Sequence, residues 1–382
     1  MTTAVYDIHA MPLSPRSPYP VVSSSRLEAN IARMQTLANH AGVRLRPHAK
    51  THKSPVIARM QIEAGAVGIC CAKLSEAAVF ADAGINDIRL PYPVNPSNAD
   101  RVVVLMERVR LSIIVDDADV AADWSGAMTR AGKVLDILVK VDVGTHRCGV
   151  NPEANDVVNT ITRIARLPGL SFRGILSHAG HTYNAESPSA LAAIVARETE
   201  IMTGLAKRVR EAGVAVDEIS VGSTPSASLA PTQRGITEMR PGNYVFLDRS
   251  QVGLGSATYE NCALFVVATV VSRPAPDRAI LDCGSKTLTS DGARGFTDLP
   301  GYGAVFLSSN ENLPDASIVI ERVSEEHAIC RVPESSPLRP GDRVRVLPNH
   351  ACTVTNLSDR LWLANDQGTL APLTVAARGR NW

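Results

Sequence analysis

The sequence predicts an α/β chain in which a (β/α)₈ barrel of the TIM type is followed by a C-terminal all-β domain. Between about residues 20 and 247, about eight short β-rich runs alternate with helical patterns, which is typical of parallel strands joined by crossover helices. After about residue 248, β-rich runs are separated by turns rich in proline and glycine, without a long helical pattern. With 382 residues and 45% hydrophobic content, the chain can bury one large core and a smaller one.

The barrel pattern begins at residues 21–22, where two valines precede the helix-start signature Ser-Arg-Leu-Glu at 25–28. Apolar residues then recur at helical spacing until Gly42 marks the expected helix end, and an alternating run follows at 43–45. Since the carboxyl ends of barrel strands share one face, polar residues directly after strands are the candidates for chemistry. The later strands are expected at residues 67–71, 87–90, 111–115, 135–141, 172–177, 218–221 and 239–246.

The second domain is expected to consist of strands and turns. Turns at 274–277 and 340–342 contain proline next to small or acidic residues, which favours short connections. The chain is therefore divided into an N-terminal surface segment (1–19), a barrel (20–247) and a C-terminal β-domain (248–382). The expected strands of the last part lie at residues 263–271, 278–281, 316–321, 327–332 and 343–347.

The composition argues against several classes of function. A net charge of +1 argues against nucleic acid or an anionic membrane as the main partner. No run of about 18 apolar residues is present, and residues 1–20 lack the basic and apolar regions of a secretory signal, so we expect a cytoplasmic protein. The seven cysteines show no Cys-x-x-Cys spacing, which favours reduced thiols over a disulfide framework.

The most informative motif is Arg-Pro-His-Ala-Lys-Thr-His-Lys at residues 46–53, directly after the run at 43–45. A lysine at the end of a buried strand loses its proton more readily, because burial disfavours the ammonium form. The neutral amine can then form a Schiff base with an aldehyde cofactor. Only seven lysines are present against 32 arginines, so the candidates are few, and Lys50 is the first of them. The alternative is a solvated basic loop.

Four further polar clusters follow expected barrel strands. Hydroxyls and backbone N–H groups in two of them are of the kind that bind phosphate. For each cluster alone, an ordinary turn, a core histidine or a surface arginine is the alternative, but a core needs none of these groups at strand ends. The clusters are 142–149 with Arg147, 177–183 with His178 and Tyr183, 222–226 with Ser223 and Thr224, and 238–244 with Gly242, Asn243 and Tyr244.

A last cluster, Pro-Asn-His-Ala-Cys-Thr, lies near the C-terminus at residues 348–353. On an extended segment His350 and Cys352 would point to the same side. Imidazole and thiolate suit Zn²⁺, and two protein ligands leave positions open for water or substrate. The alternative is a buried cysteine next to a structural histidine.

Taken together, these motifs resemble the metal-activated D-serine dehydratase and D-threonine aldolase family. The resemblance covers roughly residues 17 to 380 and implies an alanine-racemase-like barrel that binds pyridoxal 5′-phosphate (PLP), a C-terminal β-domain and a homodimer. Lys50 would carry PLP and act as a base at Cα, Arg147 would contact the phenolic oxygen of PLP, and His178 would lie against its ring. The phosphate or ring would be surrounded by Tyr183, Ser223, Thr224, Gly242, Asn243 and Tyr244.

The resemblance also implies that His350 and Cys352 hold a divalent metal over the β-hydroxyl of a D-3-hydroxy amino acid. Zn²⁺ is the metal expected first, with Mn²⁺ and Mg²⁺ as alternatives. Aldolases of the family typically show His-x-Asp and a Gly-Gly-Thr-Gly turn, whereas this chain has His-x-Cys and a Gly-Ser-Thr-Pro turn at 222–225. The resemblance therefore implies β-elimination of the D-serine dehydratase type, to a 2-oxo acid and ammonia. Retro-aldol cleavage of the D-threonine aldolase type is the alternative, and an amino-acid racemase also stays open. A PLP-homeostasis protein is a single barrel, so the expected β-domain argues against that function. Arg240 departs from the pattern of the dehydratases, which carry other residues at this position, whereas alanine racemases have an arginine bonded to the pyridine nitrogen. An arginine there would weaken the electron sink of the cofactor.

Overall fold

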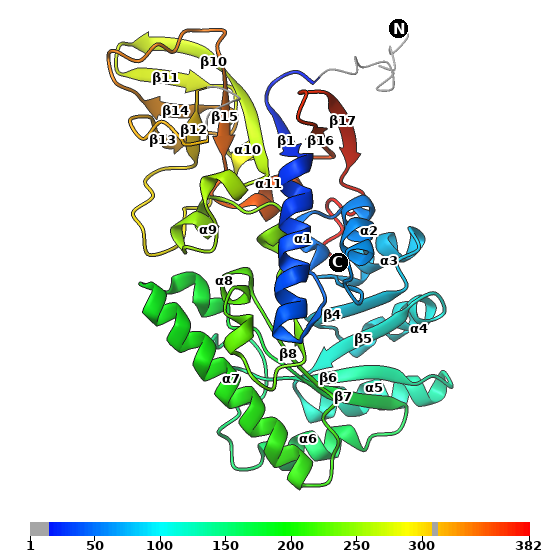
Figure 1. Ribbon diagram of the computed structural model, residues 1–382. Helices are drawn as coiled ribbons and strands as arrows, with labels where there is room; N and C mark the ends of the chain where they lie inside the picture. Colours follow the sequence, from blue (N-terminus) through cyan, green and yellow to red (C-terminus); the bar gives the residue numbers. More distant parts are fainter. Residues whose placement is uncertain (1–14, 308–311) are drawn as a thin grey trace, which may run out of the picture.

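The computed structural model describes residues 15–307 and 312–382, so most of the surface segment expected at 1–19 lies outside the described residues. The described chain has two parts, a parallel barrel and a mostly antiparallel sheet, which lie one above the other in Figure 1. Among the described helices, none combines the length and apolar character needed to cross a membrane.

Eight parallel strands form the barrel sheet in the order β2-β9-β8-β7-β6-β5-β4-β3. A bridge between His48 and Cys70 links the chain after β2 to β3, which brings the two ends of the sheet together. Each run expected after residue 42 contains a strand, so the predicted barrel is confirmed, although the last run is strand only at its start. The strands are β2 (Arg44–Leu45), β3 (Ile69–Cys70), β4 (Asp87–Pro93), β5 (Arg110–Val115), β6 (Leu135–Lys140), β7 (Leu170–Leu176), β8 (Glu218–Val221) and β9 (Glu238–Met239).

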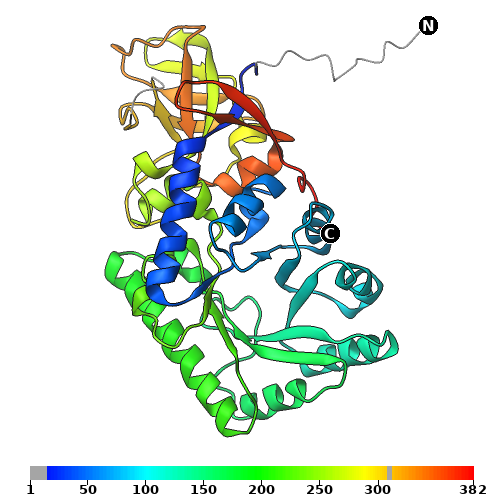
Figure 2. The ribbon, with the colours of Figure 1, turned by 45° about the vertical axis from the view of Figure 1, so that its right-hand side comes forward.

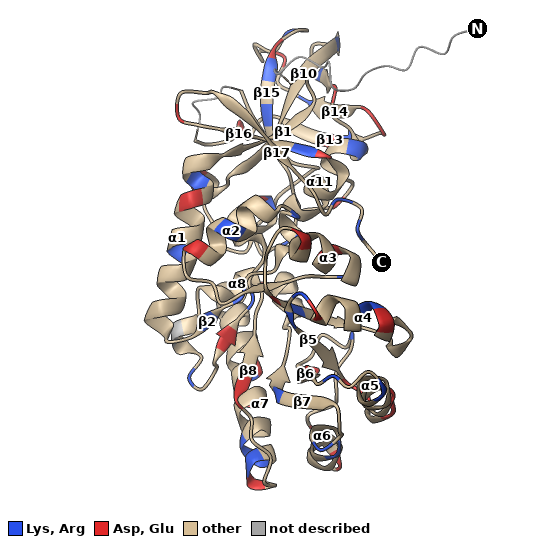
Figure 3. Cartoon of the chain, turned by 90° about the vertical axis from the view of Figure 1, so that its right-hand side faces the viewer, with Lys and Arg blue, Asp and Glu red and all other residues tan. Residues whose placement is uncertain are grey.

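Helices cover the outside of the barrel, and the colours of Figure 3 mark charged residues along α1 and α4. The first helix begins after Ser23, whose hydroxyl accepts a hydrogen bond from the backbone of Arg26, and it ends at Gly42 in the left-handed conformation. The N-cap of this helix is thus two residues earlier than the Ser-Arg-Leu-Glu signature at 25–28 predicted. The barrel helices are α1 (Ser24–Ala41), α2 (Pro55–Glu63), α3 (Leu74–Asp82), α4 (Ala99–Met106), α5 (Ala118–Arg130), α6 (Val157–Ala165), α7 (Pro188–Glu211) and α8 (Thr224–Ala227).

The second part is a nine-stranded sheet with the path β13-β14-β11-β10-β1-β16-β17, and β15 pairs with both β10 and β12. All five strands expected from the sequence are present. The sequence pattern did not predict the short strand β12 or the hairpin of β16 and β17. The strands are β10 (Leu264–Ala275), β11 (Arg278–Leu281), β12 (Ala304–Phe306), β13 (Val319–Val323), β14 (Ala328–Arg331), β15 (Arg343–Leu347), β16 (Arg360–Ala364) and β17 (Leu370–Thr374).

The strand β1 (Tyr19–Ser23) lies in this second sheet, and the expectation that residues 20–23 open the barrel is wrong. It pairs antiparallel with β10 and parallel with β16. The alternating valines identify a strand, but a local pattern contains no information about the sheet that the strand joins. The N-terminal part of the chain therefore ties the second sheet to α1 and the barrel.

Three short helices accompany the second sheet: α9 (Arg249–Gly253), α10 (Ser285–Leu288) and α11 (Ala351–Leu357). In Figures 1 and 2, α11 lies between the sheet and the barrel, close to the chain that follows β2. The buried residues of α11, Ala351 and Val354, belong to the same apolar core as Leu27 and Ile31 of α1. This shared core fixes α11 at the mouth of the barrel.

Candidate active site

Lys50 lies on a single helical turn, η2 (Ala49–Thr51), just after β2. The imidazole Nδ1 of His48 accepts a hydrogen bond from the backbone N–H of Lys50 at 3.4 Å. The turn closes where the backbone N–H of Lys53 donates to the carbonyl of Ala49 at 2.8 Å. The Lys50 side chain is exposed, so its amine is accessible to a ligand rather than enclosed in the core.

His178 follows β7, and its ring Nδ1 lies 2.7 Å from the carbonyl oxygen of Gly222. Since a carbonyl only accepts, Nδ1 carries the hydrogen. Burial, followed by the positive charge of Lys140, lowers the pKa of His178 well below its usual value. The imidazole is therefore neutral at physiological pH, and a neutral ring can pack against a planar ligand without burying a charge.

Arg147 lies in a loop that Asp142 organises. One carboxylate oxygen of Asp142 accepts hydrogen bonds from the backbone N–H groups of Gly144, Thr145 and His146, each at 3.0 Å. Burial opposes the charged form, but these backbone hydrogen bonds lower the pKa of Asp142 below its usual value. The Arg147 side chain is exposed and forms no ion pair with any described residue, so it is available to an anionic ligand group.

Ser223 and Thr224 lie where β8 passes into α8. The Ser223 hydroxyl accepts a hydrogen bond from the backbone N–H of Ser226 and caps α8, whereas Thr224 Oγ1 is buried without a partner among the described residues. Gly222 has φ +143°, and a Cβ there would lie 2.6 Å from the backbone nitrogen of Arg240. Glycine is therefore required for this close approach, and the unpaired Thr224 hydroxyl fits a polar ligand group.

Asn243 and Tyr183 line a small pocket together with His350. The Asn243 side-chain N–H donates to Asp248, while its Oδ1 has no partner in the described part of the chain. A Cβ on Gly242 would lie 3.1 Å from Thr51 Oγ1, so this glycine lets the chain pack against the Lys50 turn. These residues surround the space between Lys50 and α11.

Tyr244 is different, because its side chain belongs to the apolar core. It is 2% exposed, and its hydroxyl accepts a hydrogen bond from Gln61 Nε2 on α2 at 2.9 Å. A contact between Tyr244 and a cofactor stays a prediction.

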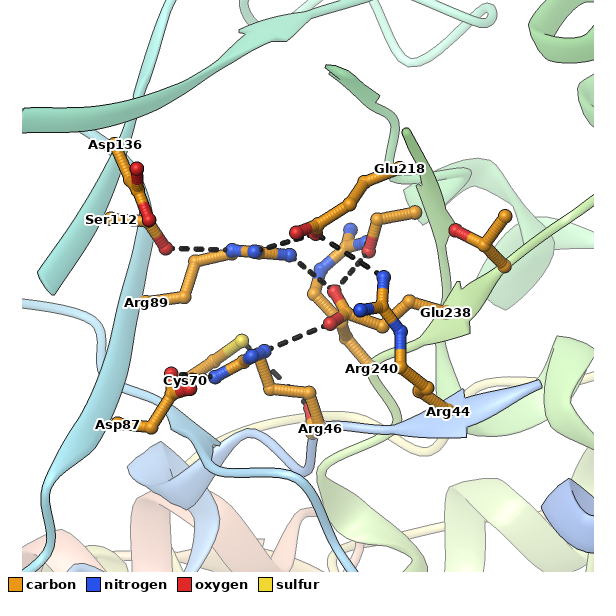
Figure 4. A network of polar contacts seen from close by, with 12 residues as sticks. Arg44, Arg46, Cys70, Asp87, Arg89, Ser112, Asp136, Glu218, Glu238 and Arg240 are labelled. Carbon is orange, nitrogen blue, oxygen red and sulfur yellow. Dashed lines mark hydrogen bonds and ion pairs between the residues drawn. The ribbon is translucent and has the colours of Figure 1, made fainter. Parts of the chain in front are cut away.

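Arg240 is part of a buried network of charged side chains inside the barrel (Figure 4). Its guanidinium donates to the Ser220 hydroxyl, which in turn donates to Glu238. Glu238 also accepts hydrogen bonds from Arg46, at 2.9 Å, and from Arg89. Burial alone would raise the pKa of Glu238, but the two arginines outweigh it and lower the pKa to about 2. A chain of buried charges thus fixes the orientation of Arg240.

His350 and Cys352 lie side by side, but not on a strand. α11 begins at Ala351, so His350 is its N-cap and Cys352 lies in its first turn, and the expectation of an extended segment is wrong. Burial opposes both charged forms, yet the interaction between the two side chains raises the pKa of His350 to about 9 and lowers that of the Cys352 thiol. Val354 packs in the core that α11 shares with α1.

Two neighbours complete this pair. Asp291 Oδ2 lies 2.7 Å from Nδ1 of His350, so this carboxylate contacts one of the two ring nitrogens. The hydroxyl of Thr51 lies 3.2 Å from the Cys352 sulfur, so the residue after Lys50 contacts α11 directly. Within the described ranges, no group of three or more His, Cys, Asp or Glu side chains is arranged to hold a metal.

The side chains present fit both groups that the resemblance implies. For PLP, a reachable lysine stands near the buried Thr224 hydroxyl, which has no partner among the described residues and can donate a hydrogen bond to a phosphate oxygen. For a metal, a thiol with a lowered pKa lies beside an imidazole that a carboxylate orients, an arrangement common around zinc. The two protein ligands leave the other positions to water or substrate.

Sequence reasoning missed three titratable residues of this region. Lys140 ends β6 and is buried; burial and the charge of Arg240 lower its pKa to about 7. Glu198 of α7 is fully buried and accepts a hydrogen bond from the Ser177 hydroxyl at 2.6 Å. The argument that selected Lys50, a lysine ending a buried strand, applies equally to Lys140 and could have found it. Asp291 carries no local signal.

Two family models match the chain. The model described as alanine racemase, N-terminal domain, matches residues 22–250, and the model described as putative serine dehydratase domain matches residues 263–364. The chain is 35% identical to a D-threonine aldolase of Arthrobacter sp. over 95% of this chain and 93% of that protein. It is also 35% identical to a D-threo-3-hydroxyaspartate dehydratase of Delftia sp., over 88% of this chain and 90% of that protein.

Solved structures show the same similarity. A D-threonine aldolase from Filomicrobium marinum superposes with a TM-score of 0.86 at 30% identity, covering 96% of this chain and 97% of the other. A cysteine-to-alanine variant of a D-threo-3-hydroxyaspartate dehydratase, described as the metal-free form, superposes with a TM-score of 0.88 at 32% identity. That alignment covers 95% of this chain and 98% of the other.

Proposed function

Because the chain belongs to the D-serine dehydratase and D-threonine aldolase family, a family of PLP-dependent lyases, we propose that it acts on D-3-hydroxy amino acids with a divalent metal. The proposed reaction is β-elimination to a 2-oxo acid and ammonia. One observation carries this proposal: Thr51, next to Lys50, contacts Cys352 at 3.2 Å. The lysine of the barrel and the ligand pair of α11 thus border the same space.

When bound, PLP supplies an electron sink that acidifies the α-hydrogen of the substrate. Lys50 would hold the cofactor, and its Nζ would take the α-proton, since this lysine follows β2 and is exposed. Neutral His178 would pack against the cofactor ring. Arg147 would bind the phenolic oxygen, and Tyr183, Ser223, Thr224, Gly242, Asn243 and Tyr244 would surround the ring or phosphate.

His350 and Cys352 would hold the metal, and Asp291 would orient the imidazole so that Nε2 faces it. A metal at this position supplies a Lewis acid for the β-hydroxyl, which makes that group a better leaving group. Thiolate and imidazole favour Zn²⁺, with Mn²⁺ and Mg²⁺ as alternatives. A cysteine-to-alanine variant of a D-threo-3-hydroxyaspartate dehydratase is described as being in the metal-free form, and this description supports a metal in the related chain.

Aldol cleavage is the second candidate, and the 35% identity to a D-threonine aldolase favours it. It uses the same lysine and metal ligands, but it needs a base for the β-hydroxyl proton instead of a leaving group. The two reactions are distinguished by their products. We also propose a homodimer in the cytoplasm, on the strength of the family resemblance.

The test is product analysis with D-serine, D-threonine and D-threo-3-hydroxyaspartate. Keto acid and ammonia in equal amounts support β-elimination, whereas glycine and an aldehyde show the aldolase. The Lys50→Ala variant and a chelated sample are the controls, and both should be inactive. Full activity after chelation would exclude the metal from the reaction and favour a racemase, which would interconvert D- and L-alanine.

A further inference from the structure

The segment of residues 375–382 leaves the second sheet after β17 and returns to the barrel, where it reaches α3 (Figure 1). Ala377 of this segment is fully buried and belongs to the barrel core. The backbone N–H of Ser75, at the start of α3, donates to the backbone oxygen of Trp382 at 3.1 Å. Although it follows the last strand of the second sheet, the segment therefore packs as part of the barrel.

Lys53 connects this segment to the Lys50 turn by both its backbone and its side chain. Its carbonyl accepts a hydrogen bond from the backbone N–H of Ala377 at 3.0 Å. Its ammonium donates to Asn381 Oδ1 at 3.1 Å and to the Ala377 carbonyl at 3.4 Å, and it lies 3.7 Å from the carboxylate of Glu76. With 6% exposure and partners on three sides, Lys53 is not a solvated surface lysine.

The backbone of Lys53 is also constrained. Its φ is +50°, in the left-handed region that non-glycine residues seldom occupy. Such a conformation persists only where the surroundings enforce it, and it occurs preferentially at functional sites. Here the enforced conformation ends the turn that carries Lys50, because the Lys53 N–H donates to the carbonyl of Ala49.

The same segment also contacts α11. The backbone N–H of Gly379 donates to Asn356 Oδ1 at 3.1 Å, and Asn356 follows Cys352 by one helical turn. The segment therefore touches the turn of Lys50 on one side and the helix of Cys352 on the other. These contacts supplement the direct contact between Thr51 and Cys352.

We propose that Lys53 is a positioning residue, which holds the 375–382 segment and thereby keeps the Lys50 turn in register with α11. This inference rests on the proposed function, because it presumes that Lys50 binds PLP and that Cys352 binds the metal. The Lys53 ammonium contacts Asn381, Ala377 and Glu76. Its contribution is to fix the direction from which the Lys50 amine faces the ligand pair.

The test replaces Lys53 by methionine, which keeps the length of the side chain and removes its three hydrogen-bond donors. We expect apoprotein of Lys53→Met to bind PLP at least tenfold more weakly in an absorbance titration, and kcat to fall more than KM rises. Lys207→Met is the matched control, since Lys207 also lies near a glutamate but is exposed on α7. It should leave the PLP affinity unchanged.

Two further variants make the outcome decisive. Asn381→Ala removes one partner of Lys53 at an exposed position, so it should fold and weaken PLP binding in the same direction. Asn356→Ala removes the contact between the segment and α11 and should also weaken PLP binding. In the double variant with Lys53→Met, the loss of PLP affinity should be smaller than the sum of the two single losses, because both changes release the same segment. If Lys53→Met does not fold, Asn381→Ala decides alone.

PLP affinity within twofold of the parent in Lys53→Met or in Asn381→Ala, measured well below the melting temperature, would overturn the inference. A lower melting temperature with unchanged PLP affinity would show a purely structural role and would also overturn it. Failure of the proposed function is seen separately: borohydride would then not attach PLP to Lys50 in the unmodified protein.

Discussion

Replacing Glu238 by glutamine should destabilise the barrel by about 3 kcal/mol at neutral pH. Glu238 is fully buried and accepts hydrogen bonds from Arg46, Arg89 and Ser220. A pKa of about 2 instead of 4.5 corresponds to about 3 kcal/mol, at about 1.4 kcal/mol for each tenfold change in proton affinity. Removal of one partner of a buried ion pair costs about 3–5 kcal/mol in other proteins, which agrees with this value.

The contribution of Glu238 to the unfolding free energy should decrease as the pH falls. The pKa of Glu238 is lower in the folded state, so its stabilisation is present above pH 4.5 and is lost as the pH falls towards 2. The assay is urea unfolding of both proteins at pH 7 and at pH 3, followed by circular dichroism. The difference in unfolding free energy between the two proteins should shrink to less than half at pH 3.

A matched control is Glu153→Gln, which removes an exposed ion pair with Arg197 and should leave the unfolding midpoint unchanged. An equal stability of Glu238→Gln and the parent at pH 7 would refute the reasoning. A difference that is the same at both pH values would refute the assignment of the effect to this carboxylate.

Three further predictions concern the site. Lys50→Ala should abolish the attachment of PLP that borohydride otherwise traps, and mass spectrometry that locates PLP on another lysine would refute the assignment. Arg147→Ala should keep its melting temperature, because the side chain is exposed, but lose at least tenfold in kcat, about 1.4 kcal/mol of barrier; a large fall in stability with unchanged kcat would contradict this. Asp291→Asn should weaken metal binding by about 10- to 100-fold in a chelator competition, because the amide orients His350 less firmly; unchanged affinity would show that Asp291 does not orient the ligand.

The barrel and the position of Lys50 could be predicted from the sequence because both are local properties. A buried strand followed by a polar turn can be recognised within about ten residues, and Lys50 lies where that pattern placed it. The sheet that β1 joins and the helix that carries Cys352 could not be predicted in this way. They depend on β10 and on the shared core with α1, which are far away in the sequence.

Asp291 shows the same limit at the level of one residue. It lies in an irregular segment between α10 and β12, where no periodicity marks a functional side chain. Only the packing of that segment against α11 brings its carboxylate to His350. Lys140, in contrast, could have been found from the sequence, because its position at the end of a strand is visible there. The structure shows that its side chain is buried, which is unusual for a lysine.

The two halves of the site come from segments about 300 residues apart, and Thr51 and Cys352 meet only because the second sheet is fixed on the barrel. That fixation runs through β1, which pairs with β10 and β16 and continues directly into α1. On the proposed function, the barrel supplies the lysine and the cofactor site, which lyases and racemases of this fold can share. The residues of α11 then determine which reaction follows, because a metal held by His350 and Cys352 would activate the β-hydroxyl. It follows that a change weakening the β1 pairing should reduce β-elimination more than α-proton exchange with solvent, since the exchange depends on Lys50 and not on α11.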